Sequence, residues 1–236
     1  MLTRTLFLSA ALLTVGTAAL AQESFVPPLG EVMVTANRQN APYYRQDRPV
    51  VGLRRPADAA VMAFTVTSDS RDYAVRKQEI QTVLSAAMSK AKAAGFELVI
   101  GNFQLEPLTD QNRKDLSYEY GGRVDTSRVT IMAKTRLAGS ADAARERLET
   151  FINSIKGSGR AAVETAGTIQ LTVINPDQYR DQVLKLVAED ARHNAALFGP
   201  EFTFNVSGTD LPIVWTQVSS TEVFLFVPYR YNINPK

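Results

Sequence analysis

The stretch from Asn175 to Gly199 constrains the fold most, because it carries the start and stop signals of one helix around a continuous apolar stripe. Asn175 is a residue type that caps helix starts, Pro176 suits the first helical position, and Gln178 stands where a capping-box side chain reaches back. Gly199 and Pro200 are typical of a helix end. The apolar side chains between them recur at helical spacing and are mostly small: Val183, Leu184, Val187, Ala188, Ala191 and Ala195. We therefore predict a helix that lies close against a sheet.

The rest of the chain alternates between strand and helix patterns. Two more helices are expected, one from the cap region at residues 68–70 to Lys92 and one from Gly139 to Gly157. Short alternating or apolar segments predict strands at residues 60–67, 96–105, 116–124, 127–137, 169–173, 202–206, 213–218 and 223–233. Strands that follow one another beside helices of this length indicate an α+β fold, with antiparallel sheets packed against long helices.

The first 21 residues have the pattern of a cleavable signal peptide. Arg4 precedes an apolar run, and small residues lead up to Ala21. A retained membrane anchor is the alternative, but the run is shorter than the roughly 20 apolar residues that span a bilayer. We therefore divide the chain into a signal peptide at 1–21, an extended N-terminal arm at 22–49 and one domain at 50–236. The predicted location is the periplasm, with a peripheral position at the outer membrane as a finer possibility, and no transmembrane segment after cleavage.

Composition excludes several classes of function. Removal of the signal peptide takes away one arginine and no acid, so the formal net charge falls from +2 to +1. A dedicated nucleic-acid binder would show a basic stripe with interleaved aromatics, so we predict no nucleic-acid partner. The chain has no cysteine, which excludes thiol catalysis, thiolate metal sites and disulfides. No metal or cofactor is predicted.

No sequence motif indicates an enzyme. His193 is the single histidine, so a multi-histidine metal centre is excluded. The glycine pairs lack the lysine and helix of a phosphate-binding loop, and no G-x-S-x-G motif occurs. One aromatic and charged cluster either binds a ligand by stacking and charge-assisted hydrogen bonds or forms an ordinary hairpin: Tyr118, Glu119, Tyr120 and Arg123. We expect a non-enzymatic protein; an active site formed only in three dimensions is the alternative.

The segment Glu31 to Arg38 is the one patterned piece of the arm. It resembles the segment that follows the signal peptide in TonB-dependent outer-membrane transporters, where an extended peptide adds a strand to a partner protein. An ordinary strand or an extended arm explains the same alternation. If the resemblance holds, the protein is an adaptor for an envelope partner, and its partner-binding residues are Glu31, Val32, Val34, Thr35 and Arg38.

The last predicted strand, residues 223–233, is long and aromatic on both faces. Pro228 cannot donate to a sheet ladder, so this part is expected at an edge or a bulge. Such a strand needs cover, either from another element of the chain or from a second subunit. The residues that would then form a homo-oligomer contact are Phe224, Phe226, Tyr229 and Tyr231.

The order of elements behind a signal peptide is similar to that of the SIMPL-domain (DUF541) family of secreted bacterial proteins. The resemblance covers about Val50 to Ile233 and is carried by Val51-Gly52, Pro56-Ala57-Asp58, Gly95-Phe96, Tyr179, the run from Ala188 to Ala195, and Pro228 to Tyr231. The glycine-alternating first strand of the family is reduced here to Val51-Gly52, and the N-terminal arm is longer. The resemblance implies an α+β domain of the periplasm or envelope without assigned catalytic residues. It also implies ring assembly, as in some members, and a link to envelope stress defence.

Overall fold

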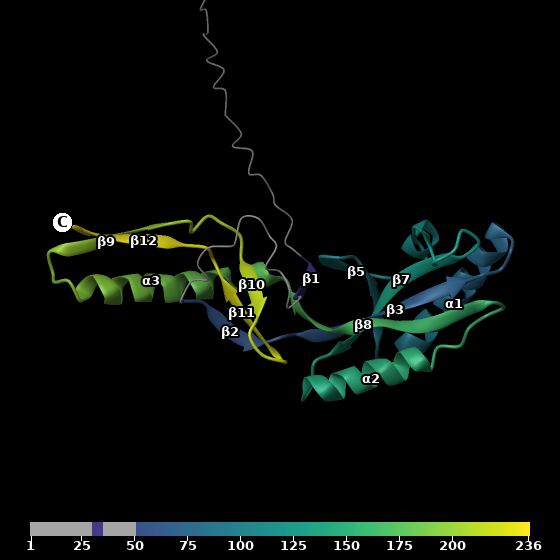
Figure 1. Ribbon diagram of the computed structural model, residues 1–236. Coiled ribbons are helices and arrows are strands. Elements are labelled where there is room, and N and C mark those ends of the chain that lie inside the picture. Colours follow the sequence, from purple (N-terminus) through teal and green to yellow (C-terminus); the bar gives the residue numbers. More distant parts are fainter. Residues whose placement is uncertain (1–29, 35–50) are drawn as a thin grey trace, which may run out of the picture.

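The strand β3 (Ala59–Ser68) is the centre of the larger sheet. The computed structural model describes residues 30–34 and 51–236, and Figure 1 shows their arrangement. The predicted signal peptide and most of the predicted arm lie outside these residues. β3 pairs antiparallel with β7 (Ser127–Arg136) along its whole length, and on its other side with β8 (Ala161–Ile174). Its alternate side chains are buried on two different faces, which explains its nearly continuous apolar sequence.

The outer sides of β7 and β8 are connected to one another through three short strands, so the hydrogen-bonded strands close into a ring. β4 (Glu97–Ile100) pairs with β7, β5 (Gln104–Pro107) pairs with β4, and β1 (Glu31–Val34) joins β5 to β8. The short β6 (Glu119–Tyr120) extends the outer side of β7. A small core fills the inside of the ring: Met33, Val61, Val99, Leu105 and Met132. Among the described residues β1 covers only the last four residues of β8, so the remainder of β8 is paired on the β3 side alone.

Two helices cover the outer face of β3 and β7. α1 (Tyr73–Ala94) begins at Asp72, whose carboxylate accepts from the Val75 N–H at 3.0 Å, and ends at Gly95 in the left-handed conformation with φ 74°. α2 (Ala141–Asn153) begins at Ser140, whose hydroxyl accepts from the Ala143 N–H. Buried side chains of both helices share one core with β3 and β7. The 3-10 turn η2 (Asn112–Asp115) contacts α1. The expected helix positions are confirmed: α2 is shorter than expected, whereas α1 starts later than expected and runs beyond Lys92 to Ala94.

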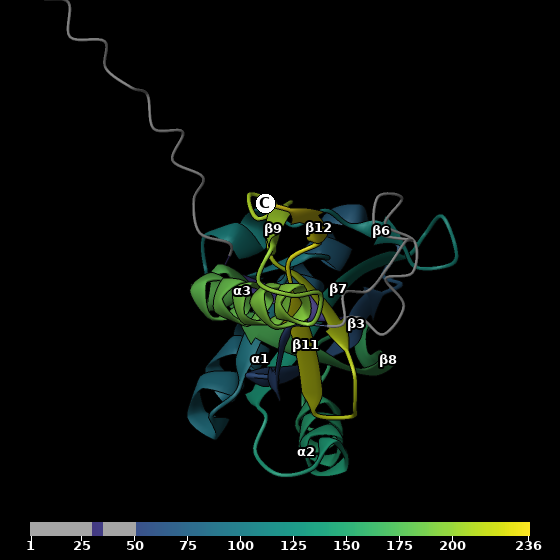
Figure 2. The ribbon, with the colours of Figure 1, turned by 90° about the vertical axis from the view of Figure 1, so that its left-hand side faces the viewer.

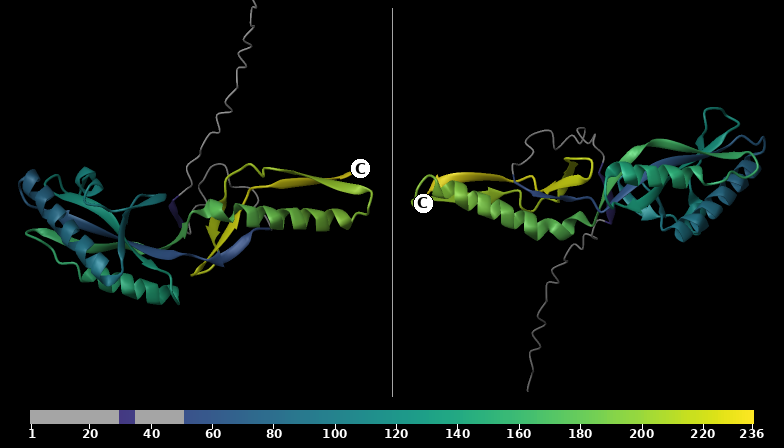
Figure 3. Two further views of the ribbon diagram at one scale, coloured as in Figure 1. Left: turned by 180° about the vertical axis from the view of Figure 1, so that it is seen from behind. Right: turned by 90° about the horizontal axis from the view of Figure 1, so that it is seen from below.

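A third core lies where β8 leaves the ring. The sheet β10 (Val214–Gln217), β11 (Glu222–Phe226) and β2 (Leu53–Pro56) is antiparallel and packs against the end of β8 through Leu171 and Val173. The register of β8 on β3 shifts between Val61 and Ala63, opposite Gly167, whose φ of 85° favours glycine. One long strand therefore contributes to this core and to the core beneath α1 and α2. Figures 1 and 3 show the path of β8 between the two parts of the molecule.

The far end of the molecule is a thin arm, shown end-on in Figure 2. It consists of α3 (Arg180–Ala196), preceded by the turn η3 (Pro176–Tyr179), and a two-stranded ribbon of β9 (Phe202–Ser207) and β12 (Arg230–Pro235). Val183, Val187, Ala191 and Ala195 form the buried stripe of α3, as predicted. Small residues at its end let the ribbon lie close to the helix.

Several expected boundaries are wrong for local reasons. Residues 96–105 form a hairpin of two strands, and only Glu119–Tyr120 of the expected strand 116–124 pairs. The expected strand 223–233 divides into β11 and β12 around Pro228. Asn175 adopts φ 41° and its side chain makes no capping bond, because a 3-10 turn precedes α3. Gln178 donates its side-chain amide to the Ile174 carbonyl at 2.7 Å.

Candidate functional site

The four residues of β1 are held on both sides by the domain. Glu31 pairs with Leu105 of β5 and with Ile174 of β8, and Val34 pairs with Leu171. The expected boundary at residue 50 therefore does not separate Glu31–Val34 from the domain. Val32 and Val34 belong to this strand, whereas Thr35 and Arg38 lie outside the described residues. Partner binding by this segment stays a prediction, and it would require β1 to leave β5 and β8, since its backbone is already paired.

A nearly buried ion pair fastens the start of β1. The Glu31 side chain is 9% exposed and accepts from the Lys134 ammonium of β7 and from the Thr172 hydroxyl of β8. Lys134 also pairs with Glu97 of β4. Burial disfavours the lysine charge, but the hydrogen bonds to Glu31 and Glu97 outweigh it and raise the pKa of Lys134 above its ordinary value. This network joins four strands of the ring, which is a structural role.

The structure places the four predicted oligomer residues in two different environments. Phe224 and Phe226 belong to β11, lie 5.6 Å apart between ring centroids, and are 7% and 8% exposed, so they present little surface to a second chain. Tyr229 and Tyr231 lie stacked beside α3 with centroids 6.1 Å apart. Burial raises the pKa of Tyr229 to about 12, and the nearby Asp190 carboxylate adds to the shift. The half-buried tyrosines fill the space between β12 and the helix.

The β9–β12 ribbon has backbone groups that the described residues leave unpaired. The Lys236 N–H donates to the Glu201 carbonyl at 2.7 Å, and these residues are opposite one another in the register that pairs Pro235 with Phe202. Hydrogen-bonded pairs alternate along an antiparallel ladder. The N–H and C=O groups of Phe204 and Val206 and the C=O of Phe202 therefore point away from β12, whereas the Phe202 N–H already donates to the Gly199 carbonyl at 3.2 Å. In the part of the chain that the structure describes, no strand pairs with this edge of β9.

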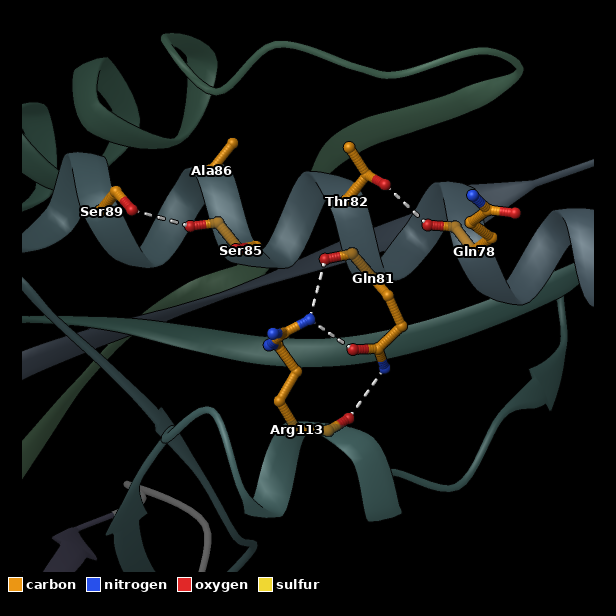
Figure 4. Close-up of a pocket in the computed structure, with 7 residues that line it drawn as sticks. All are labelled: Gln78, Gln81, Thr82, Ser85, Ala86, Ser89 and Arg113. Carbon is orange, nitrogen blue, oxygen red and sulfur yellow. Dashed lines mark hydrogen bonds between the residues drawn. The ribbon is translucent and has the colours of Figure 1, made fainter.

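An open groove of about 470 Å³ lies along α1 (Figure 4). Its lining is uncharged except for Arg113 of η2: Gln78, Gln81, Thr82, Ser85, Ala86 and Ser89. Most of its polar groups already bond within the groove. Arg113 donates to the Gln81 backbone and side-chain oxygens at 3.1 and 2.7 Å, and the Gln81 amide donates to the Arg113 carbonyl at 2.8 Å. The arrangement fixes η2 on α1 and offers few free hydrogen-bonding groups.

The predicted aromatic and charged cluster does not converge on one point. The Gln81 amide donates to the Tyr118 hydroxyl at 2.6 Å, whereas Glu119 pairs with Arg128 at 3.1 Å. Arg123 pairs with Asp69 and Asp125, and Tyr120 is exposed. His193 is exposed on α3. Within residues 30–34 and 51–236, histidine and acidic side chains form no group of three that could hold a metal ion.

Sequence reasoning missed the open edge of β9. The available signal was the six-residue segment from Phe202 to Ser207, which contains no charge, proline or glycine. Such segments pair readily with other strands, and natural proteins usually protect them with charges or prolines. The prediction placed the exposed strand at 223–233 instead, because that segment is longer and more aromatic.

These features define an α+β protein with three apolar cores and a protruding arm. Residues 52–209 match the family model SIMPL, described as a protein of unknown function (DUF541). Because the match covers more than half of the chain, the protein belongs to the SIMPL family. No curated protein and no solved structure matches. No helix among the described residues combines the length and hydrophobicity that crossing a bilayer requires.

Proposed function

We propose that this SIMPL-domain protein is a non-enzymatic protein of the periplasm or cell envelope that acts by binding or self-assembly. The observation that carries the proposal is the arm, in which a two-stranded ribbon on one helix leaves apolar side chains half-covered and, among the described residues, both outer strand edges unpaired. Isolated two-stranded ribbons are marginally stable, so further pairing is favourable. The signal-peptide pattern supports the compartment, and the family resemblance supports a role in envelope stress defence.

Self-assembly is tested by the solution mass of the chain from Gln22 to Lys236, measured by light scattering over a wide range of concentrations. A mass above that of one chain, constant or rising with concentration, is the expected result. A single-chain mass at every concentration overturns self-assembly and leaves binding of a different partner.

The alternative is an envelope adaptor that offers residues 31–38 to a TonB-like partner. In this structure β1 occupies the space between β5 and β8, so the alternative needs the strand to detach. Substitution of Lys134 by methionine removes its contact with Glu31 and eases detachment, and it leaves residues 31–38 unchanged. Stronger capture of the periplasmic domain of an energy-transducing protein by this variant than by the wild type would favour the adaptor, and equal absence of capture would count against it.

A further inference from the structure

We propose that the outer edge of β9 pairs antiparallel with β9 of a second copy of this chain, around a two-fold axis at Phe204. The inference rests on the proposed self-assembly and names the surface that performs it. It starts from the backbone: Phe204 and Val206 each direct an N–H and a C=O away from β12, and Phe202 offers its C=O, since its N–H donates to the Gly199 carbonyl at 3.2 Å. A strand that adds to an edge of this kind gains main-chain hydrogen bonds on alternate residues.

The two edges of the ribbon are not equivalent. On β12, Pro235 removes one outward N–H, Pro228 lies just before the strand, and Arg230 places a charge at its start. These are devices that proteins use against edge pairing. Pro200 precedes β9 as Pro228 precedes β12, but within its bounds β9 carries no charge and no proline, since its sequence is Phe-Thr-Phe-Asn-Val-Ser. The accessible edge is therefore that of β9.

The β9 edge is complementary to itself, which favours a second copy as the occupant. With the axis at Phe204, the two Phe204 residues face one another and exchange both backbone hydrogen bonds, and Phe202 faces Val206 of the second copy. Aromatic and β-branched pairs of this kind stabilise antiparallel strands. No charge on the strand repels its twin. A two-fold axis through paired strands also makes the interface isologous and closed.

The side chains on the two faces of β9 fit this arrangement. Phe202, Phe204 and Val206 are half-buried on the α3 side, whereas Thr203 and Asn205 are exposed on the other side. Pairing extends both rows across a continuous sheet of β12, β9, β9 and β12 with the two α3 helices on one face. Phe198 is 59% exposed and its ring lies 5.9 Å from Phe202, so a strand added at Phe202 lies beside it.

The test places like charges across the predicted contact. Thr203 of one copy faces Asn205 of the other, so the double substitution Thr203→Lys and Asn205→Lys sets lysine against lysine at both ends of the interface. The new side chains point to solvent in the single chain, and its thermal unfolding should not change. The matched control is Asn232→Lys with Asn234→Lys, which puts the same charges on the same ribbon face but on β12.

Light scattering across concentrations gives the readout. The expected result is that the β9 variant needs at least about tenfold more protein for half-assembly than the wild type, while the β12 variant stays within about twofold. Mixing the lysine variant with a Thr203→Glu, Asn205→Glu variant should restore assembly, since opposite charges then face one another.

Three outcomes would overturn the inference. If the wild type assembles and the β9 variant assembles equally well, the β9 edge is not the contact surface, and self-assembly must use another surface. Equal weakening by the β9 and β12 variants indicates a general charge effect. A wild type that is a single chain at every concentration removes both this inference and the proposed self-assembly.

Discussion

Met33→Ala should destabilise the whole domain, although the sequence assigns Met33 to the extended N-terminal arm at residues 22–49. The side chain is 8% exposed and fills the ring beside Val61, Leu105 and Met132. Truncation of a buried methionine to alanine typically costs 2–5 kcal/mol, because it combines lost transfer free energy with a cavity. We expect about 2–3 kcal/mol, in the lower half of that range, since β1 has four residues and its detachment limits the loss.

The free energy of unfolding can be measured by urea denaturation followed by circular dichroism and by fluorescence of Trp215. In a thermal scan the same loss corresponds to a fall in midpoint of about 5–10 °C for a domain of this size. Val75→Ala is the control, because Val75 is 43% exposed on α1 and its truncation should change stability by no more than about 0.5 kcal/mol. A Met33→Ala midpoint equal to that of the wild type would show that β1 is not part of the cooperative unit.

Three further predictions concern the ion pair, the tyrosines and a close backbone contact. Lys134→Met should cost about 2 kcal/mol at neutral pH in urea titrations, because it leaves Glu31 nearly buried without its cation. The raised pKa of Lys134 gives the sign of the pH dependence: its contribution is complete below the unfolded pKa near 10.5 and is lost as pH rises through the folded pKa, so wild type and variant should converge in strong alkali. In an ultraviolet absorbance titration Tyr229 should ionise near pH 12, and Asp190→Asn should move that step to lower pH; an unchanged last step would contradict the assigned environment. Gly52→Ala should lower the thermal midpoint by several degrees, because the new Cβ would lie 2.5 Å from a carbonyl oxygen of β11.

Local signals in the sequence were sufficient for the helices and for the fold class. Ser140 and Gly95 act where the patterns place helix ends, the cap of α1 is Asp72 just beyond the expected region at 68–70, and the buried stripe of α3 follows its small residues. These features depend on neighbours within a few residues, so a single sequence contains them.

Pairing between distant strands was not predictable in the same way. Glu31 meets Thr172, which is 141 residues away, and no periodicity near residue 31 identifies that partner. The pattern at residues 31–34 predicts an extended strand equally well whether it pairs within the domain or with another protein. The unpaired edge of β9 was missed for the same reason. Whether an edge of β9 is free depends on which distant strands pair with it, and the sequence around residues 202–207 does not contain that information.

The length of β8 has a mechanical consequence. Its 14 residues span about 46 Å, and they run from the core beneath α1 and α2 into the core that supports α3. A force that pulls the arm of α3, β9 and β12 along the direction of β8 acts in shear on the ladder between β8 and β3. The force is then shared among many hydrogen bonds at once and is not carried by a single loop. The arm formed by α3, β9 and β12 can therefore transmit tension to the part of the molecule beneath α1 and α2 without hinging.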